Sequence, residues 1–369
     1  MSRLDELLRE LCPDGVEYVK IGDVVNFEQP SKYIVKSTDY NDEYPTPVLT
    51  AGQTFILGYT NEEDGHYKAS KEQPVIIFDD FTGAFKWVDF EFKVKSSAMK
   101  MLTADESRTS LRYIYHIMGK IGLSSSEHKR LWIGVYSEFK IPLPPLKVQS
   151  EIVRILDNFT ELTAELTAEL TARKKQYDYY CEKLFMENEK AKWVTLAEIA
   201  DIGTGSSNTN EAEEDGQYLF YVRSQEPLRK NTYEYDETAI ITAGDGVGVG
   251  KVFHYVEGKY ALHQRAYRIH INTSEVSPRY FFFYMRTTFL EYIQKNMFQG
   301  SVASIRRPML NAYPVPVPPL EEQLRIVDVL NRFDILCNDI SSGLPAEIEA
   351  RQKQYEYYRD KLLSFKELA

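Results

Sequence analysis

The stretch Ile141-Pro-Leu-Pro-Pro-Leu146 opens a segment that this chain of 369 residues contains twice. The same pattern begins again at Val315-Pro-Val-Pro-Pro-Leu320, 174 residues further on. A second block recurs downstream, as Arg173-Lys-Lys-Gln-Tyr-Asp-Tyr-Tyr180 and Arg351-Gln-Lys-Gln-Tyr-Glu-Tyr-Tyr358, at an offset of 178 residues. The first copy therefore holds four extra residues, which lie in the tandem Thr163-Ala-Glu-Leu-Thr-Ala-Glu-Leu170.

The duplication also covers the segments that precede these blocks. Tyr18-Val-Lys-Ile21 recurs as Trp193-Val-Thr-Leu196, so the repeat unit runs from about residue 18 and again from about residue 193. The continuation after the first helix has no counterpart after the second, but it resembles residues 7–18. The repeat is therefore circular, and we expect the two ends of the chain to lie together and the halves to be related by pseudo-twofold symmetry.

Two stretches that differ in sequence but follow one plan lie between the repeated segments. Strand-like runs precede a helical pattern in both, at 47–50, 74–78, 90–94 and then 111–118 in the first, and at 239–242, 251–256, 267–271 and then 279–285 in the second. The predicted fold class is α/β (α+β), with two globules of similar plan alternating with two long helices. The predicted organisation is an N-terminal helix in 1–17, a globule in 18–145, a helix in 146–190, a globule in 191–318 and a helix in 319–369.

The repeated helices carry a coiled-coil pattern. The first extends over about 40 residues, or about 60 Å at 1.5 Å per residue. Residues spaced alternately by four and three form a seam that we assign to contacts between helices and with partner subunits: Ile152, Leu156, Phe159, Leu166, Leu170, Tyr177, Tyr180 and Leu184, then Ile326, Leu330, Phe333, Tyr355, Tyr358 and Leu362. We expect the seams to pack antiparallel; the alternative is two unrelated helices, each on its own domain. Proline at the end of Ser341-Ser-Gly-Leu-Pro345 predicts a kink or break.

Composition limits the class of protein. The three cysteines, Cys12, Cys181 and Cys337, lie far apart and lack metal-ligand spacing, which suits a reducing cytosol and predicts no metal site. The N-terminal residues are too charged for a signal peptide, and no apolar run is long enough to span a membrane, so we expect a cytoplasmic protein. The net charge of −11 speaks against nucleic-acid binding, but residues 217–313 contain 12 Lys and Arg against 8 Asp and Glu.

Catalytic motifs are weak. The run Gly244-Asp-Gly-Val-Gly-Val-Gly-Lys251 does not match a phosphate loop, because Asp245 and Val252 stand where glycine and a hydroxyl residue are required. Asp80, Glu91 and Lys93 have the spacing of a metal-dependent nuclease core, but the second globule has no equivalent set. No methyltransferase signature is present.

Residue types suited to DNA recognition are grouped in both globules. In His263-Gln264-Arg265, glutamine suits adenine and arginine suits guanine, while lysine and hydroxyl side chains suit phosphate. The predicted DNA contacts are Lys32, Lys68, Lys86, Lys95, Ser97, Lys100, His128, Lys129 and Arg130 in the first globule, and Arg223, Gln225, Lys251, His263, Gln264, Arg265, Arg268, Gln299, Ser301, Arg306 and Arg307 in the second. Solvated surface charge is the alternative interpretation for each cluster.

This organisation resembles the specificity subunit of type I restriction–modification systems over essentially the whole chain. The most specific marks are the paired Pro-x-Pro-Pro-Leu entries at Pro142 and Pro316, the paired Arg-x-Lys-Gln-Tyr blocks at Arg173 and Arg351, and the Thr-Ala-Glu-Leu tandem, which points to the IC group. The first globule also looks like a target-recognition domain of that group in 28–33, 76–80 and 95–100. Gly244–Lys251 with His263–Arg265 looks like a recurring pattern among such domains.

The resemblance implies a non-catalytic DNA-recognition subunit without a cofactor of its own. Each globule would read one half of a bipartite, asymmetric DNA site, and the helices would set the spacer and dock two methyltransferase subunits. These partners would bind S-adenosylmethionine, ATP and Mg²⁺, with two restriction subunits completing the complex. The competing classes are a coiled-coil scaffold whose globules bind proteins, and the nuclease built on Asp80, Glu91 and Lys93.

Overall fold

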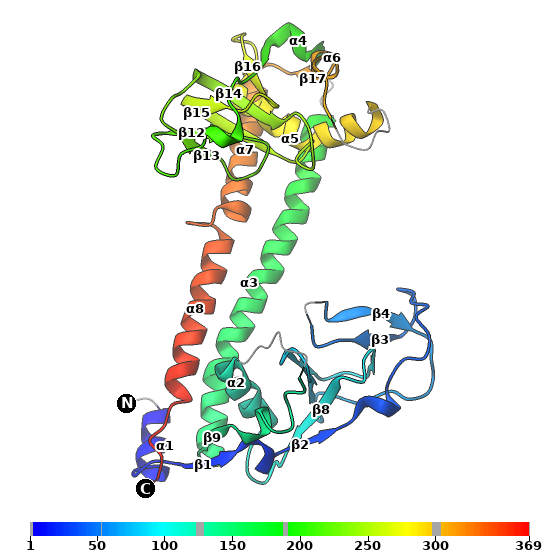
Figure 1. Cartoon of the computed structure of the whole chain (residues 1–369), viewed down its shortest axis with the longest axis vertical. Helices are drawn as coiled ribbons and strands as arrows, with labels where there is room; N and C mark the ends of the chain where they lie inside the picture. Colours follow the sequence, from blue (N-terminus) through cyan, green and yellow to red (C-terminus); the bar gives the residue numbers. More distant parts are fainter. Residues whose placement is uncertain (1–2, 53, 123–128, 187–190, 297–303, 369) are drawn as a thin grey trace. The chain divides into compact units, whose positions relative to one another are not determined.

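The computed structural model describes residues 3–52, 54–122, 129–186, 191–296 and 304–368. The chain divides into two compact units. Unit 1 comprises residues 1–165 and 348–369, and unit 2 comprises residues 166–347. The long helix α3 (Leu146–Met186) contributes to both (Figure 1). Within the described ranges, every helix is too short or too polar to cross a membrane.

Unit 1 combines a mixed set of sheets with helices. Its four-stranded sheet has the order β2-β8-β5-β6, its three-stranded sheet the order β4-β3-β7, and β1 pairs with β9. The elements are α1 (Arg3–Leu11), β1 (Glu17–Lys20), β2 (Val25–Glu28), β3 (Thr46–Leu49), β4 (Ile56–Thr60), β5 (Val75–Asp79), β6 (Phe85–Val88), β7 (Lys93–Val94), β8 (Met99–Ala104), α2 (Leu111–Ile121), β9 (Lys140–Leu143), the start of α3, and all but the first turn of α8 (Leu344–Leu362).

Unit 2 is built around one six-stranded sheet of order β11-β16-β14-β15-β12-β13, with β10 paired to β17. Its elements are the end of α3, β10 (Lys192–Thr195), α4 (Leu196–Ile199), β11 (Ala200–Thr204), β12 (Tyr218–Tyr221), β13 (Leu228–Lys230), β14 (Tyr235–Ala243), β15 (Phe253–Leu262), β16 (Ala266–Ile271), α5 (Pro278–Asn296), α6 (Arg307–Asn311), β17 (Pro314–Val317) and α7 (Leu320–Asn338). The predicted α+β class is confirmed for both units.

The two units share a sheet plan down to the register. The order β2-β8-β5-β6 in unit 1 matches β11-β16-β14-β15 in unit 2, and all of these neighbours are antiparallel. Ile76 of β5 faces Leu102 of β8, as Ile240 of β14 faces Ile269 of β16. Alternating apolar residues therefore fill the same sheet positions in two globules of unlike sequence.

Most of the expected elements are present, but the strand expected over 90–94 is shorter. Only Lys93 and Val94 form β7, which pairs in parallel with β3, while Phe92 forms an isolated bridge with Tyr67. The glycine-rich run at 244–250 lies between β14 and β15, so no helix follows it to bind phosphate. The run is therefore a loop between strands, in agreement with its mismatch to a phosphate loop in sequence.

The proline motifs form one strand of a two-stranded sheet in each unit. Proline is tolerated there because the backbone N–H that it lacks would point away from the partner strand. The hydroxyl of Tyr113 donates to the carbonyl of Pro142 at 3.0 Å, and the hydroxyl of Tyr280 donates to the carbonyl of Pro316 at 2.9 Å. The repeated proline entry is thus held by an equivalent tyrosine from α2 or α5.

A buried glutamine joins each entry to its globule. Gln149 is fully buried, accepts from the backbone N–H of Ser110 at 3.1 Å, and donates to the carbonyls of Arg108 and Pro144 at 3.0 and 2.8 Å. Its side-chain oxygen also accepts from the hydroxyl of Thr109 at 2.9 Å. Three of the four contacts tie the start of α3 to the segment that leads into α2, and the fourth, to Pro144, holds the proline entry.

The second copy repeats this arrangement. Gln323 is also fully buried, accepts from the N–H of Ser277, and donates to the carbonyls of Glu275 and Pro318, each at 2.8 Å. Here the glutamine ties α7 to the segment that leads into α5. The recurrence of Gln149 at Gln323 therefore reflects one buried hydrogen-bonding site made twice.

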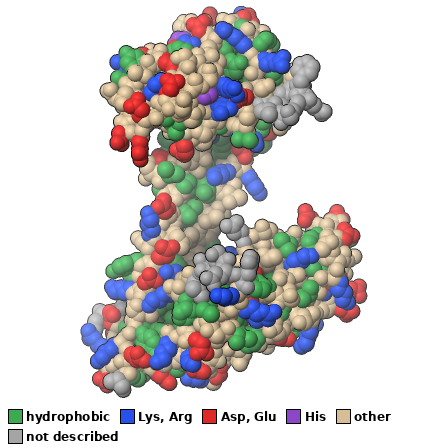
Figure 2. All heavy atoms as spheres, in the orientation of Figure 1, with side chains coloured by type: hydrophobic (Ala, Val, Ile, Leu, Met, Phe, Trp, Pro, Cys, Tyr) green, Lys and Arg blue, Asp and Glu red, His purple; other side chains and the backbone are tan. Residues whose placement is uncertain are grey.

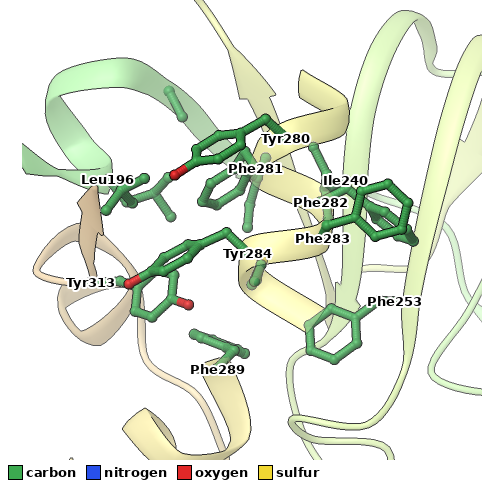
Figure 3. Close-up of a cluster of buried hydrophobic side chains, with 14 of the residues drawn as sticks. Leu196, Ile240, Phe253, Tyr280, Phe281, Phe282, Phe283, Tyr284, Phe289 and Tyr313 are labelled. Atoms are coloured by element: carbon green, nitrogen blue, oxygen red, sulfur yellow. The ribbon is translucent and has the colours of Figure 1, made fainter. Parts of the chain in front are cut away.

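The aromatic run of α5 forms the centre of unit 2. The five residues from Tyr280 to Tyr284 are all buried, together with Phe289, Tyr313 and residues of β11, β14, β15 and β16 (Figure 3). The hydroxyls of Tyr280 and Tyr284 point to β17 and donate to its proline carbonyls. Burial of these rings supplies the main apolar stabilisation, and the tyrosine hydroxyls avoid the cost of unpaired polar groups.

The long helices contact their globules with apolar residues and one another with aromatic residues. Ile152 and Leu156 are fully buried in the core of unit 1, as Ile326 and Leu330 are in the core of unit 2. Leu166, Leu170 and Leu184 are half-buried along α3. The predicted seam residues thus divide into residues buried in the core of a globule and half-buried residues along the helix.

Helix-to-helix contacts follow the duplication. In unit 1, Phe159 of α3 stacks on Tyr358 of α8 with ring centroids 5.3 Å apart. In unit 2, Tyr180 of α3 packs on Phe333 of α7 with centroids 5.7 Å apart, and Tyr177 touches the same ring. Phe159 corresponds to Phe333 in the repeat and Tyr358 to Tyr180, so each unit makes the same pair, in the order expected of antiparallel helices.

The predicted helix break is confirmed, since α7 ends at Asn338 and α8 begins at Leu344. The carboxylate of Asp339 accepts from the hydroxyls of Ser341 and Ser342, and these bonds lower its pKa to about 2. A Cβ on Gly343 would lie 2.4 Å from the carbonyl oxygen of Ile335, so only glycine fits the turn.

The chain ends pair within unit 1, as the circular repeat predicts. Val16 forms a parallel bridge with Glu367, and the hydroxyl of Tyr18 donates to the carbonyl of Phe365 at 2.9 Å. Gly15, with φ of 126°, approaches the carbonyl of Lys366 so closely that a Cβ would lie 2.4 Å from it. Figure 1 marks both ends beside α1.

Substituting Gln149→Leu is expected to destabilise unit 1 by about 2–4 kcal/mol, because buried donors and acceptors lose their partner. Urea denaturation followed by tryptophan fluorescence in a Trp193→Phe background measures this, since the remaining Trp87 and Trp132 both lie in unit 1. Gln352→Leu on the exposed face of α8 is the matched control and leaves the midpoint unchanged. Equal midpoints for the two variants would contradict the assignment.

Candidate nucleic-acid interface

Three segments meet at one end of the unit 2 sheet. The N–H of Gly244, after β14, donates to the carbonyl of Arg265, before β16, at 2.9 Å. The N–H of Ile305 in turn donates to the carbonyl of Gly244 at 2.8 Å. Asp245 and Ser304 form an isolated bridge beside these bonds. The glycine-rich loop is therefore fixed between the His263–Arg265 turn and the segment that begins at Ser304.

Unit 1 makes the same connection with different residues. The N–H of Asp80, after β5, donates to the carbonyl of Ala98, before β8, at 2.9 Å, and the N–H of Leu131 donates to the carbonyl of Asp80 at 2.7 Å. Asp80 thus occupies the position of Gly244, and Ala98 that of Arg265. We call these equivalent three-segment groups the loop clusters of unit 1 and unit 2.

Six predicted contacts lie in or beside the loop cluster of unit 2. Arg265, Gln264, Arg223, Gln225, Lys251 and Arg306 are all exposed. Arg223, Gln225 and Lys251 line one pocket, of about 710 Å³, together with residues of the glycine-rich loop. Arg307 follows Arg306 and begins α6. Exposed guanidinium, amide and ammonium groups from four separate segments therefore share one surface.

Gln264 and the predicted contact beside it, His263, are held in place by neighbours in the loop cluster of unit 2. Gln264 donates through its side-chain amide to the side chain of Asn208, and its N–H donates to the carbonyl of Ser207 at 3.0 Å. His263 is buried, stacks on Phe220, and accepts from the N–H of Arg265 at 3.0 Å through Nδ1. Burial and the nearby arginines lower the pKa of His263. The histidine thus supports the turn, and the residues beside it face solvent.

The two arginines nearest the glycine-rich loop share one carboxylate. Asp245 accepts from Nη1 of Arg223 at 2.5 Å and from Nη1 of Arg265 at 3.1 Å. Burial alone would raise the pKa of Asp245, but the hydrogen bonds and charges of the two arginines outweigh it and lower that pKa. Asp245 is missing from the predicted contacts because an acidic residue gives no direct signal for DNA binding.

The loop cluster of unit 1 presents Lys95, Ser97, Lys129 and Arg130, all exposed. The ammonium of Lys95 lies 6.0 Å from the ring centroid of Tyr40. Ile133 keeps 62% of its surface exposed just beyond Arg130, as Val247 does at 97% in the loop cluster of unit 2. The exposed aliphatic residues, which suit contact with a thymine methyl group, were not predicted because sequence patterns assign such residues to the core.

Lys100 does not reach the surface of unit 1. It is fully buried, with its ammonium 3.2 Å from the Asp80 carboxylate and 3.0 Å from the Gln29 side-chain oxygen. Asp80 also accepts from the N–H of Trp132 at 2.8 Å. The prediction that Lys100 contacts DNA is wrong for this geometry; its charge is used to anchor the segment that carries Arg130.

Arg268 is engaged in the same way within the sheet of unit 2. Its guanidinium donates to both carboxylate oxygens of Glu237, at 2.7 and 2.9 Å, and covers the ring of Tyr235. The side chain is only 14% exposed. A paired arginine in this position stabilises strand packing and has few donors left for DNA, and the DNA contact at Arg268 stays a prediction.

The remaining predicted contacts lie at other places in unit 1 or outside the described ranges. Lys32 pairs with Glu28 at 3.1 Å, Lys86 is half-buried on β6, and exposed Lys68 lines a separate pocket. The predicted contacts outside the described residues are His128, Gln299 and Ser301. The loop clusters therefore carry the interface that the described geometry supports.

The nuclease alternative has no geometric basis. Asp80 pairs with Lys100, Glu91 pairs with His66 at 3.0 Å, and Lys93 is buried against Glu62 at 2.8 Å. The three side chains thus have three different partners instead of one shared centre. Among the residues that the structure describes, no three His, Cys, Asp or Glu side chains gather as metal ligands.

Charged side chains of both signs are dispersed over the face shown in Figure 2. On the face shown in Figure 2, acidic and basic side chains alternate without a large field of one sign. Several basic residues outside the loop clusters form local pairs, such as Lys20 with Glu138 and Lys230 with Glu211. The net charge of −11 therefore does not preclude local basic surfaces.

Comparison with known proteins agrees with this architecture. The family model described as the type I restriction modification DNA specificity domain matches residues 13–173 and again 188–350. The chain is 44% identical to the type I restriction enzyme EcoR124I/EcoR124II specificity subunit of Escherichia coli, over 99% of this chain and 97% of that protein. It is 28% identical to a putative type I specificity subunit of Haemophilus influenzae, over 95% and 96% of the two chains.

Solved structures show the same fold. The type I restriction–modification S subunit from M. genitalium aligns with a TM-score of 0.67 at 15% identity, over 95% of this chain and 96% of that chain. A chain from a structure described as the basis of complex assembly and conformational transition of the type I R-M system aligns with a TM-score of 0.58 at 15% identity, over 96% and 98%. The chain belongs to the type I restriction–modification DNA specificity family.

Proposed function

We propose that each unit reads one half of a bipartite, asymmetric DNA site through its loop cluster. The observation that carries this proposal is the pair of backbone hydrogen bonds repeated as Asp80–Ala98 with Leu131–Asp80, and as Gly244–Arg265 with Ile305–Gly244. One scaffold thus presents two different sets of exposed side chains. Because base readout depends on those side chains, the two half-sites differ.

The proposed partners follow from the family. The chain binds double-stranded DNA and assembles with two methyltransferase subunits, and two restriction subunits join in the complete complex. S-adenosylmethionine, ATP and Mg²⁺ are bound by these partners, and this chain acts in the cytoplasm as their non-catalytic recognition subunit. In the proposed complex, the target-recognition domains are residues 18–145 and 191–318.

The helices are proposed to set the spacer between half-sites and to dock the methyltransferase subunits. The tandem Thr163–Leu170 lies inside the uninterrupted helix α3. One four-residue unit adds about 6 Å and a rotation of about 40° beyond a full turn. A change of one unit therefore keeps Leu166 and Leu170 near the same face while altering length by less than two base pairs of about 3.4 Å.

Deleting Thr167–Leu170 is expected to shorten the non-specific spacer by one or two base pairs and to leave both half-sites unchanged. The physical reason is that the deletion removes about 6 Å of helix without touching either loop cluster. Methylome sequencing of cells that carry the variant and its methyltransferase subunits gives the recognised motif.

Insertion of a third Thr-Ala-Glu-Leu unit after Leu170 is the reciprocal variant and is expected to lengthen the spacer. Leu166→Ala, which keeps the helix length, is the control and leaves the spacer unchanged. A deletion that altered the bases of either half-site would contradict the proposed division of roles between helix and loop clusters.

Arg130→Ala in unit 1 and Arg306→Ala in unit 2 are each expected to weaken DNA binding by the reconstituted complex. Loss of one phosphate contact lowers the slope of log affinity against log salt by about one. Titrations of labelled target DNA at several salt concentrations measure both quantities. Lys295→Ala, at the exposed end of α5, is the matched control.

The same titrations separate DNA recognition from the scaffold alternative. A scaffold whose globules bind proteins would show an unchanged salt slope for both arginine variants. Because the two substitutions lie one in each unit, similar losses in both variants point to DNA contact by both loop clusters, and thermal melting of each variant checks that it is folded.

A further inference from the structure

We propose that Asp245 is a positioning residue for sequence readout, and that it sets the orientation of the Arg223 and Arg265 guanidinium groups toward the second half-site. The inference rests on the proposed function and deepens it. It assigns a role to an acidic residue at a surface where DNA phosphates would disfavour an unpaired carboxylate.

The geometry supports a shared orientation of the arginines. They reach Asp245 from different segments, Arg223 after β12 and Arg265 before β16, with each Nη1 donating to a different carboxylate oxygen. The side chain of Asp245 is 22% exposed, against 41% for Arg223 and 62% for Arg265. The carboxylate is thus less exposed than the two guanidinium groups, which remain accessible to solvent.

Asp245 itself is fixed by the backbone of the loop cluster of unit 2. It follows Gly244, whose N–H and carbonyl are both hydrogen-bonded, and it bridges to Ser304. A Cβ on Gly244 would lie 2.6 Å from the carbonyl of Arg265, so the loop approaches the turn as closely as glycine permits. The loop backbone therefore holds Asp245 in place, and its carboxylate restrains each arginine that pairs with it.

The backbone of Arg265 is also fixed, by hydrogen bonds of its N–H and its carbonyl. Its N–H donates to Nδ1 of buried His263, and its carbonyl accepts from Gly244. One Nη1 contact then restrains the side chain and leaves further N–H donors of the guanidinium for a base edge. An arginine has five such donors in a planar fork, and bidentate pairing with guanine needs two in a defined direction.

The pair of Arg268 with Glu237 provides a contrast in the same unit. There the carboxylate takes two bonds from one arginine that is 14% exposed, which leaves that arginine unsuited to a ligand. At Asp245 the carboxylate is divided between two exposed arginines. Restraint before binding lowers the entropic cost of contact and narrows the set of bases that fit.

The test is Asp245→Asn in the complex reconstituted with its methyltransferase subunits. The variant is expected to lose about tenfold or more of the discrimination between the target and targets altered at single positions of the half-site read by unit 2. Discrimination at the other half-site stays unchanged. Methylation of DNA libraries randomised in one half-site at a time measures both ratios, and thermal melting verifies folding.

Asp236→Asn is the matched control, because Asp236 is an exposed acid on β14 away from the loop cluster of unit 2 and its loss changes the net charge equally. Arg265→Gln provides the second comparison. If Asp245 acts through Arg265, adding Asp245→Asn to Arg265→Gln relaxes the half-site no further at the position read by Arg265. A residue that only stabilised the loop would lower the melting temperature and total methylation without changing the ratios.

The outcomes separate this inference from the function on which it rests. A wild-type complex that shows no half-site preference contradicts both. A wild-type complex with two half-sites and an Asp245→Asn variant with unchanged discrimination overturns the role of Asp245 alone. If Asp245→Asn does not fold, Asp245→Glu, which keeps the charge and moves the carboxylate by one methylene, must relax the same half-site.

Discussion

A buried glutamine amide is the interaction on which the rest of this structure depends. Gln149 and Gln323 each join a proline entry, the first turn of a long helix, and the segment that starts the globule's own helix. An amide can donate and accept at once, so one side chain satisfies backbone groups from several segments. Replacing it with an apolar residue would leave those groups buried without partners. The joint therefore fixes how a variable globule attaches to a repeated helix, and it does so in the same way twice.

The same separation between frame and variable surface appears in the sheets. Ile76 and Leu102 keep the register of Ile240 and Ile269, and the loop clusters keep two backbone hydrogen bonds. Backbone bonds do not depend on side-chain identity, so the frame persists while exposed residues change. Unit 1 supports its loop cluster with a buried Lys100–Asp80 pair, and unit 2 does so with glycine and a stacked histidine. Different interior chemistry thus holds equivalent loops.

The repeat makes the architecture predictable from sequence. The site is less predictable, because its loops place residues from distant parts of the chain beside one another. The offset between Pro142 and Pro316 and the helical spacing of the two seams can be read directly from the order of residues in the sequence. The roles of Lys100 and Arg268 depend on Gln29, Asp80 and Glu237, which come close only through sheet pairing. Sequence patterns place a charged residue on a strand but do not identify a partner that neutralises it. For the same reason the sequence pattern shows Asp245 only as a mismatch to a phosphate loop, although in space it joins two arginines.

The pairing of Val16 with Glu367 has a consequence for the order in which the protein forms on the ribosome. Unit 2 is one continuous segment, residues 166–347, so all of its residues are synthesised before residues 348–369. Unit 1 is discontinuous and needs residues 348–369, including Leu363 in its core. Because domains form as their segments emerge, unit 2 can be complete while unit 1 still waits for its last helix. Residues 1–165 thus precede unit 2 in the chain but complete their fold after it.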